Sequence, residues 1–317
     1  MKKLFFLIPL TIVAVAAFFA WFYINSQAPS PNQNFSFFVI DKDSSVSTIG
    51  DKLQSAGFIK SALVFKLYIR FTGQTSKLQS GEFRLTPSSS LFQTINTLFK
   101  GPIELWVTIP EGLRSEEIAA RFASGLYKDS SFTSEFLKAA KGKEGYLFPD
   151  TYLFPLDVTP TTIMQKMTET FTAKTQGLTV QGSNLTFSQA VILASLLERE
   201  TKTDTERPIV AGILINRLNL GMPLQVDASV QYAVGTPADW WPIITLNDLK
   251  VNSLYNTYKY AGLPPAPIAN PGLSSFKAAL NPAQTDYLYY ISDTSGQIHY
   301  AKTLAEQNAN IAKYLGK

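Results

Sequence analysis

Two glutamates in the second half of the chain have the residue type and the surroundings needed for acid–base chemistry. Glu198 and Glu200 stand near the end of the segment LASLLERETK, residues 193–202, which is apolar until Glu198. A carboxyl group can give a proton to a leaving group if it stays protonated near neutral pH. Burial among apolar side chains raises a carboxyl pKa and favours that protonated form. The segment therefore allows a general acid at the end of a helix, but an ordinary charged helix end explains it as well.

The composition favours carboxylates over other catalytic groups. The 317 residues contain no cysteine and one histidine, His299. Disulfides and cysteine-based sites are thereby excluded, and a histidine triad or zinc site is disfavoured because zinc usually needs several His or Cys ligands. We expect no metal and no cofactor, and a structural or surface role for His299. The net charge of +4 comes from scattered lysines and arginines, so nucleic acid is not an expected partner.

The helix that carries the two glutamates is predicted to begin at Thr186, which has capping-box spacing to Gln189. With about 100° between successive residues, one buried stripe is formed by Ala190, Leu193, Ala194 and Leu197. Glu198 and Glu200 lie on opposite edges of this stripe and cannot act as one carboxylate pair. Helical geometry does not say which edge faces a cleft. It also leaves open a plain surface role for Glu198, in ion pairs with Arg199, Lys202 or Arg207.

Polar and aromatic residues in two later segments are candidates to line a cleft around a sugar. Sugar rings stack on aromatic faces, and their hydroxyl groups need fixed polar partners. Gln225 and Asp227 follow the next helical segment, and a long loop carries Tyr255 and Asn256. Such long loops are usually functional, although a proline-stiffened lid over the core explains this loop as well.

The N-terminus predicts a membrane anchor. Residues 1–3, MKK, precede an uncharged apolar run over 4–24, and a helix needs about 20 such residues to cross the hydrocarbon core. Lys2 and Lys3 would hold the N-terminus in the cytoplasm by the positive-inside rule. A cleavable signal peptide is the alternative, with Ser26-Gln27-Ala28 as its cleavage site. We therefore expect a single-span signal anchor in the plasma membrane, with the catalytic part of the chain outside the cytoplasm.

Three segments follow the predicted anchor. A Pro/Ser/Asn/Gln linker covers 25–34, a small αβ module covers 35–102, and a larger domain covers 103–317. In the module, strands, Ser-rich caps, short amphipathic helices and Gly turns resemble a LysM-like unit that binds cell-wall glycan. The predicted fold class is therefore α+β, with an N-terminal transmembrane helix, a LysM-like module and a mixed α/β catalytic domain.

Five ordered segments resemble one known family, the MltG/YceG-like endolytic murein transglycosylases. They are EGYLFPDTY, LASLLERET, ERPIVAGILINRLNLGMPLQVDASVQY, YNTYKYAGLPPAPIANPG and YLYYISDTSGQIHYAKTLAEQN. The resemblance covers nearly the whole chain. One departure is Gln307, where relatives commonly have a histidine.

The resemblance implies a lyase that cuts the bond from N-acetylmuramic acid to N-acetylglucosamine in nascent peptidoglycan strands and leaves 1,6-anhydro ends. In such an enzyme one glutamic acid protonates the leaving oxygen and then takes a proton from the muramyl 6-hydroxyl group. Carried over by motif position, that acid is Glu198, with Glu200 in a supporting role. The other matched cleft positions are Glu144, Asp150, Tyr152, Asp227, Tyr255 and Asn256. Peptidoglycan strands and cell-wall synthases are the implied partners.

A second hypothesis is a non-catalytic glycan-binding scaffold of the cell-wall synthesis complex. It explains the predicted anchor and the LysM-like module equally well. The two hypotheses differ at Glu198, because a scaffold tolerates Glu198→Gln whereas an enzyme loses its activity. A hydrolase acting on another polysaccharide is disfavoured because nothing in the sequence marks a second catalytic carboxylate.

Overall fold

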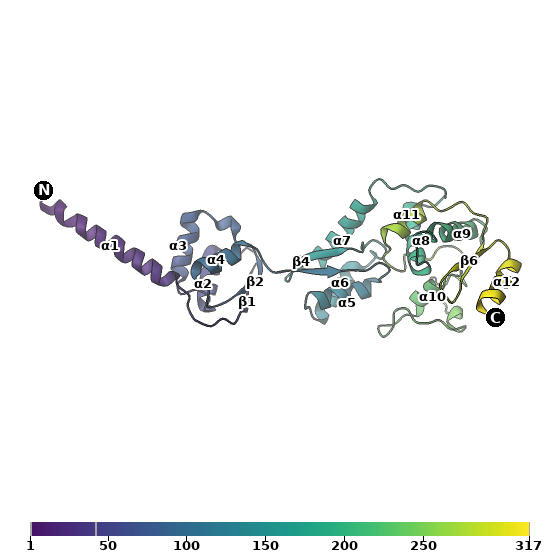
Figure 1. The fold of residues 1–317 in the computed structure, drawn as a ribbon, viewed down its shortest axis with the longest axis horizontal. Helices are drawn as coiled ribbons and strands as arrows, with labels where there is room; N and C mark the ends of the chain where they lie inside the picture. Colours follow the sequence, from purple (N-terminus) through teal and green to yellow (C-terminus); the bar gives the residue numbers. More distant parts are fainter. Residues whose placement is uncertain (1, 42, 317) are drawn as a thin grey trace. The chain divides into compact units, whose positions relative to one another are not determined.

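The computed structural model describes residues 2–41 and 43–316, with side chains from residue 11 onward. The chain divides into two units (Figure 1): unit 1 is formed by residues 1–106 and 153–158, and unit 2 by residues 107–152 and 159–317. Each unit has a hydrophobic core of its own.

Unit 1 packs short helices against a two-stranded sheet. Its elements are α1 (Lys2–Ser26), β1 (Ser36–Ile40), α2 (Val46–Ser55), α3 (Ala62–Thr72), the 3₁₀ turn η1 (Thr75–Lys77), β2 (Gly81–Leu85) and α4 (Leu91–Phe99). β1 and β2 are antiparallel, with Ser36 opposite Leu85 and Ile40 opposite Gly81. Serine side chains cap the starts of α2, α3 and α4, so each short helix has a defined first turn.

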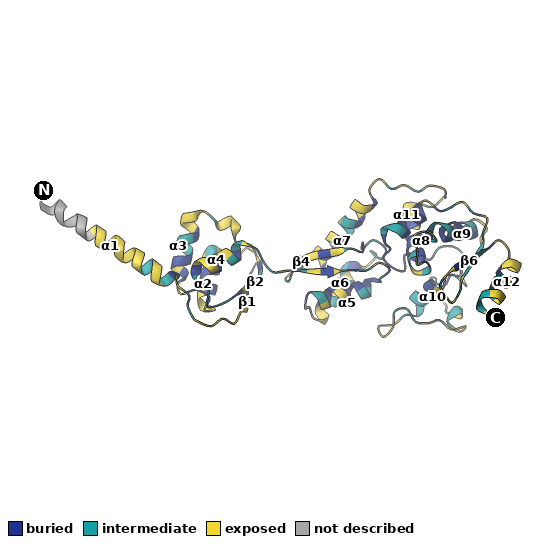
Figure 2. Cartoon of the chain, viewed as in Figure 1, coloured by how far each residue is buried: buried dark blue, intermediate teal, exposed yellow. Residues whose placement is uncertain are grey.

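The α1 helix overturns one prediction made from the sequence. Among the residues that the structure describes, no helix is both long enough and apolar enough to cross a membrane. The predicted transmembrane signal anchor over 4–24 is therefore wrong, and so is the predicted single-pass location in the plasma membrane. The side chains of the predicted cytoplasmic tail, residues 1–3, lie outside the described part. Near its C-terminal end α1 packs on the core of unit 1 through Trp21 and Phe22. Most of the described part of α1 before this end is exposed (Figure 2).

A second two-stranded sheet is formed by β3 (Glu104–Thr108) and β4 (Thr151–Pro155), and the boundary between the units crosses both strands. Beyond this sheet, unit 2 contains α5 (Ser115–Gly125), α6 (Ser130–Ala140), α7 (Pro160–Thr175), α8 (Phe187–Glu200), α9 (Arg207–Asn219), α10 (Asp227–Val234), the 3₁₀ turn η2 (Asp248–Lys250), α11 (Leu273–Leu280), β5 (Tyr289–Ser292), β6 (Ile298–Ala301) and α12 (Leu304–Leu315). The described part is thus helical with small antiparallel sheets.

The α8 helix lies at the centre of unit 2, where it packs against α9 and α11 (Figure 1). The predicted capping box at its start is confirmed: the Thr186 hydroxyl accepts from the Gln189 N–H, and the Gln189 side chain accepts from the Thr186 N–H. The predicted apolar stripe is fully buried, together with Val191 and Leu196. Because this buried stripe runs up to Leu197, the core holds the end of the helix that carries Glu198 and Glu200.

Candidate functional site

The two carboxylates at the end of α8 point to different partners. Glu198 Oε2 accepts a hydrogen bond from the backbone N–H of Gly272 at 2.9 Å, and Glu198 Oε1 lies 3.4 Å from Arg207 Nη2. Glu200 Oε2 accepts from the hydroxyl group of Tyr290 at 2.9 Å. The helix therefore has two chemically different edges at its end, which we call the Glu198 edge and the Glu200 pocket.

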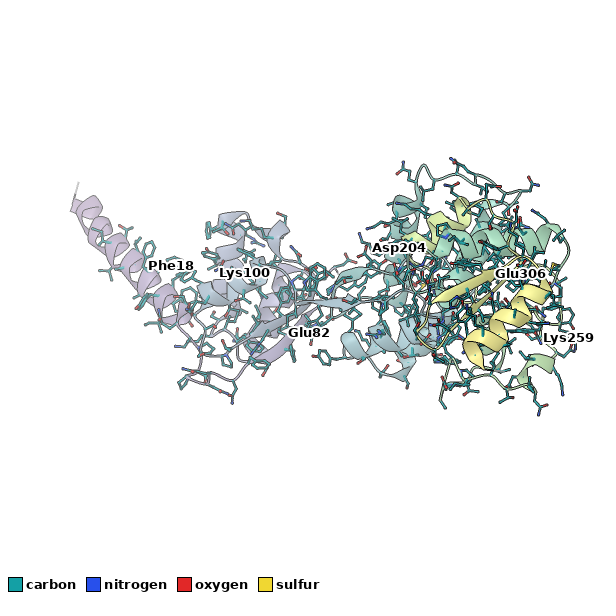
Figure 3. The ribbon with its side chains drawn as sticks, turned by 45° about the vertical axis from the view of Figure 1, so that its right-hand side comes forward. Phe18, Glu82, Lys100, Asp204, Lys259 and Glu306 are labelled. Atoms are coloured by element: carbon teal, nitrogen blue, oxygen red, sulfur yellow. The ribbon has the colours of Figure 1, made fainter. Side chains whose placement is uncertain are left out.

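The Glu198 edge is held by a small polar network. Arg207 also forms an ion pair with Asp204, which is labelled in Figure 3, and donates to Ser274 Oγ at 3.3 Å. Ser274 Oγ in turn donates to Asp204 Oδ1 at 2.6 Å. Beside this network lies a hollow of about 550 Å³ lined by Asp204, Ser274 and Leu273 among others. The apolar neighbours expected for Glu198 are buried in the core, whereas its two oxygens meet hydrogen-bond donors.

A third carboxylate, Glu111, joins this edge from a distant part of the sequence. It precedes Gly112, whose positive φ of 77° turns the chain after Ile109, and the Gly112 N–H donates to the carbonyl oxygen of Asn270 at 2.9 Å. This contact places the Glu111 carboxyl against the α-carbon of Gly272: a methyl group added there would lie 1.7 Å from Glu111 Oε1. Burial, and then the charge of Glu198, raise the pKa of Glu111 above its usual range.

A buried hydrogen-bond network, which we call the Asn270 brace, connects the loops that carry Glu111 and Gly272. Asn270 Oδ1 accepts from the N–H groups of Gly145 and Leu147, both at 2.9 Å, and its amide group donates to Glu144 Oε1 at 2.5 Å. Glu144 Oε2 accepts from the Ser115 N–H at 3.1 Å. Burial raises the pKa of Glu144 to about 7. The predicted site residue Glu144 thus supports the Glu111 and Gly272 loops from inside.

The Glu200 pocket is a separate hollow of about 520 Å³, lined by Glu200, Arg217, Gln225, Asp227, Tyr258 and Tyr290 among others. Burial raises the pKa of Glu200 to about 7 against the opposing effect of the Tyr290 hydrogen bond. Asp227 accepts a short hydrogen bond from Tyr258, and Gln225 accepts from Arg217 Nη1 at 3.3 Å. Three predicted supporting residues, Glu200, Gln225 and Asp227, are therefore brought together here.

An aromatic cluster surrounds two arginines beside the site. The Arg114 guanidinium lies 4.1 Å from the ring centre of Tyr232 and 4.6 Å from that of Trp240, and the Arg199 guanidinium lies 3.8 Å from Trp241. The predicted site residue Tyr255 packs on Tyr232, with ring centres 4.8 Å apart. Tyr255 therefore belongs to the cluster that stacks on Arg114.

Three predicted site residues have other contacts. Tyr152 is buried and donates to the carbonyl oxygen of Phe148 at 2.6 Å. Asn256 is fully buried and donates to the carbonyl oxygens of Leu249 and Val251. The Asp150 carboxylate accepts from the Thr151 N–H at 2.8 Å and pairs with Lys174 at 3.5 Å. Tyr152 thus fixes the start of β4 against Phe148, and Asn256 fixes the loop to which it belongs.

Four residues of the Glu198 edge were not among the predicted site residues: Glu111, Arg207, Asn270 and Gly272. The sequence predicted Arg207 only as one alternative for a surface ion pair with Glu198. Glu111 stands directly before the glycine turn at Gly112, and Gly272 stands directly before the helix α11. A polar residue or a glycine at such a turn or helix start is the sequence feature that could have pointed to them. His299 stacks on Tyr314 and pairs with Asp293, which gives it a structural role.

Comparison with known proteins agrees with this architecture. The model of the YceG-like family matches residues 38–313. A Bacillus subtilis protein named endolytic murein transglycosylase is 32% identical over 308 residues, which cover 87% of this chain and 84% of that protein. A Streptococcus pneumoniae protein of the same name is 28% identical over 98% of this chain, which spans 64% of that protein's length.

A solved structure has a similar fold. The crystal structure of a YceG-like protein from Listeria monocytogenes aligns with a TM-score of 0.55 and 29% sequence identity, over 87% of this chain and 99% of that one. The match of the family model extends over far more than half of the chain. The chain therefore belongs to the YceG-like family.

Proposed function

We propose that this protein cleaves the bond from N-acetylmuramic acid to N-acetylglucosamine inside peptidoglycan strands, forms 1,6-anhydro ends and so terminates or trims glycan elongation. The coarser part of this function follows from the family: the protein is a peptidoglycan-cleaving transglycosylase, a lyase, like the relatives named endolytic murein transglycosylase. Cleavage inside the strand and formation of the 1,6-anhydro product are the parts of the function that we propose beyond this family assignment. Cell-wall synthases, which make the strands, are its proposed partners.

One observation carries the assignment of the site. Glu198, at the motif position of the family's acid, is held at the end of a buried helix by Gly272 and Arg207, beside the hollow lined by Asp204 and Ser274. A glycosidase that uses water needs two carboxylates around the bond, whereas here the muramyl 6-hydroxyl group is the nucleophile. One carboxyl at Glu198 can therefore act first as acid and then as base.

Unit 1 is proposed to hold the glycan strand, as its resemblance to a LysM-like module implies. Phe35 and Phe37 are exposed on or beside β1, and a hollow of about 680 Å³ is lined by Phe37, Val39 and Thr48 among others. Exposed rings of this kind can stack on sugars. In the inactive Glu198→Gln background, Phe37→Ala should weaken binding to glycan strands without lowering the melting temperature, and Phe71→Ala, another exposed ring of unit 1, should not. Equal binding by both variants would contradict this role.

The function is tested by incubating the full chain with uncrosslinked glycan strands and reading the products by mass spectrometry. Anhydro-muramyl ends are expected from the wild type. Reducing ends would show a hydrolase instead, and unchanged strands would favour the scaffold hypothesis.

The site assignment is tested with matched variants in the same assay. Loss of a general acid typically costs about 10²- to 10⁴-fold in rate, so Glu198→Gln should lower product formation by at least about 100-fold while the variant stays folded at the assay temperature. Glu135→Gln, at an exposed carboxylate on α6, should keep wild-type activity. An active Glu198→Gln variant would contradict the assignment.

A further inference from the structure

The Glu200 pocket has a buried acceptor that no donor meets. Glu200 itself is held by the protein, because its oxygens accept from the Tyr290 hydroxyl group and from the Ala228 N–H. Gln307, on α12, also lines the pocket and is only 8% exposed. Its amide group donates to the carbonyl oxygen of Tyr290, but within the described residues nothing donates to its Oε1 atom. A buried acceptor without a donor is costly, so this atom indicates a ligand that supplies an N–H group.

Two more side chains of the lining have hydrogen-bonding capacity to spare. Tyr258 donates to Oδ1 of Asp227, and in the described part of the chain no group donates to Oδ2, so this exposed carboxylate can pair with a cation. Gln225 accepts from Arg217 through Oε1, and its NH₂ group has no acceptor among the same residues. Gln225 also has a positive φ of 54°, and such strained positions are common at ligand sites. The pocket therefore offers one anion, one neutral acceptor and one neutral donor.

One side of the pocket is apolar. α12 contributes Leu304, Ile311 and Leu315 to the lining. The methylene chain of a long amine packs on such side chains while its ammonium group reaches a carboxylate. The histidine that relatives commonly have in place of Gln307 would repel a cation when protonated, whereas the glutamine stays neutral at every pH. The lining thus suits an aliphatic amine that is part of a peptide.

Resting on the proposed function, we propose that the Glu200 pocket binds the stem peptide carried by the muramyl residue at the site of cleavage. Asp227 pairs with the ammonium group of the peptide's diamino acid, Gln307 accepts from a peptide N–H group, and Gln225 donates to a peptide carbonyl oxygen. Uncrosslinked strands carry this free ammonium group, whereas crosslinking converts it to an amide. The pocket therefore favours nascent, uncrosslinked strands.

The dimensions of α8 allow one strand to occupy both edges. Glu198 and Glu200 belong to the last turn of the helix, whose diameter with side chains is about 10–12 Å. Three extended residues span about 10 Å. The third residue of a peptide whose sugar lies at the Glu198 edge can therefore reach the Glu200 pocket. A peptide bound there fixes the position of the strand relative to Glu198.

The test compares three preparations of uncrosslinked strands: intact, acetylated at the side-chain amino group, and stripped of their stem peptides. The full chain with Glu198→Gln binds strands without cleaving them, so calorimetry gives an affinity for each preparation. We expect intact strands to bind about 10-fold more tightly than either of the others, because hydrogen bonds to charged groups contribute at least this much. With the active chain the same order should appear in KM, while kcat changes by less than about twofold.

Two variants in the Glu198→Gln background assign the contacts. Asp227→Asn keeps an oxygen for the Tyr258 hydroxyl group but removes the charge. It should weaken binding of intact strands about 10-fold and leave acetylated strands unaffected, since both changes remove one interaction. Gln307→Met keeps the length of the side chain but removes the acceptor, so it should weaken binding of intact and acetylated strands by about 5-fold, and not that of stripped strands. Glu135→Gln and Gln176→Met, at exposed positions, are the controls and should bind as the parent does.

The outcomes separate this proposal from the proposed function. Acetylated or stripped strands that bind as tightly as intact ones, or an Asp227→Asn variant that discriminates as the parent does, would overturn the role of the pocket and leave the proposed function in place. A wild-type chain that makes no anhydro ends would overturn the proposed function, and binding by the Glu198→Gln chain would still decide on the pocket. Melting curves identify any variant that unfolds. If Gln307→Met is one of them, Asp227→Asn, at an exposed side chain, carries the test.

Discussion

At the residue scale, burial and hydrogen-bond partners decide what each carboxylate of unit 2 can do. Glu198 and Glu200 are two residues apart, yet one meets a guanidinium and the other a tyrosine hydroxyl. The helical wheel predicts this separation, because it depends only on the period of the helix. It does not predict Glu111, because that contact depends on how the loops around Gly112 and Gly272 meet in the fold.

Tyr290 is expected to lower the pKa of Glu200. Its hydroxyl group donates to Glu200 Oε2 at 2.9 Å and so stabilises the carboxylate against the effect of burial. Tyr290→Phe should therefore raise the Glu200 pKa further above about 7, as measured by carboxyl-carbon NMR titration. Tyr127→Phe, at an exposed tyrosine, should leave that titration unchanged. A Glu200 pKa that falls in Tyr290→Phe would contradict the expected sign.

Glu144 should make folding stability depend on pH. Its pKa is about 7 in the folded chain, against an ordinary value of 4.5. Between those values the folded state binds more protons at Glu144 than the unfolded state, so the contribution of Glu144 to stability is greatest below about pH 4.5 and falls as the pH rises towards 7. The contribution is on the order of 3 kcal/mol.

Glu144→Gln should flatten that part of the stability profile, measured by urea unfolding at a series of pH values. Glu200 should leave some of the slope in place, because burial raises its pKa in the same direction. Glu135→Gln should reproduce the wild-type slope. A slope in Glu144→Gln as steep as in the wild type would show that Glu144 does not titrate in this range.

At the element scale, Asn270 is expected to hold three segments together. Its side chain bonds Gly145 and Leu147 on one segment, Glu144 at the start of that turn, and the carbonyl oxygen of Leu113 on another. Asn270→Ala would leave several buried polar groups without a partner, each at a cost of about 1–3 kcal/mol. We expect a loss of about 2–4 kcal/mol in the free energy of unfolding. Asn219→Ala, at the exposed end of α9, should cost less than about 0.5 kcal/mol, and a similarly small loss at Asn270 would refute the brace.

Helices with a clear cap and apolar period could be predicted from the sequence, whereas contacts between distant loops could not. The α8 helix was predictable because its capping box and its apolar period lie within fifteen residues, and the structure confirms both. The transmembrane helix over 4–24 was predicted from the length of an apolar run and the lysines before it, and it is the element that the structure contradicts. The sequence did not predict a role for Gly272, because its contacts are with Glu111 and Glu198, which lie far from it in the chain.

At the scale of the whole molecule, two separate cores predict two separate unfolding events. The core of unit 1 contains Phe65 and the core of unit 2 contains Phe276, and both rings are fully buried. Removing a buried phenylalanine ring costs about 3–5 kcal/mol. Phe65→Ala should therefore lower the transition of unit 1, and Phe276→Ala that of unit 2.

Scanning calorimetry of the full chain distinguishes independent units from a single cooperative one. Because each core is built from the residues of its own unit, each substitution should move one transition and leave the other within about 2 °C. If both substitutions moved one shared transition, the units would unfold together. The glycan assay adds a functional readout, since at a temperature where only the Phe65→Ala unit has melted, the unit that carries Glu111 and Glu198 should still form anhydro ends. Loss of those ends under that condition would mean that cleavage needs unit 1 to hold the strand.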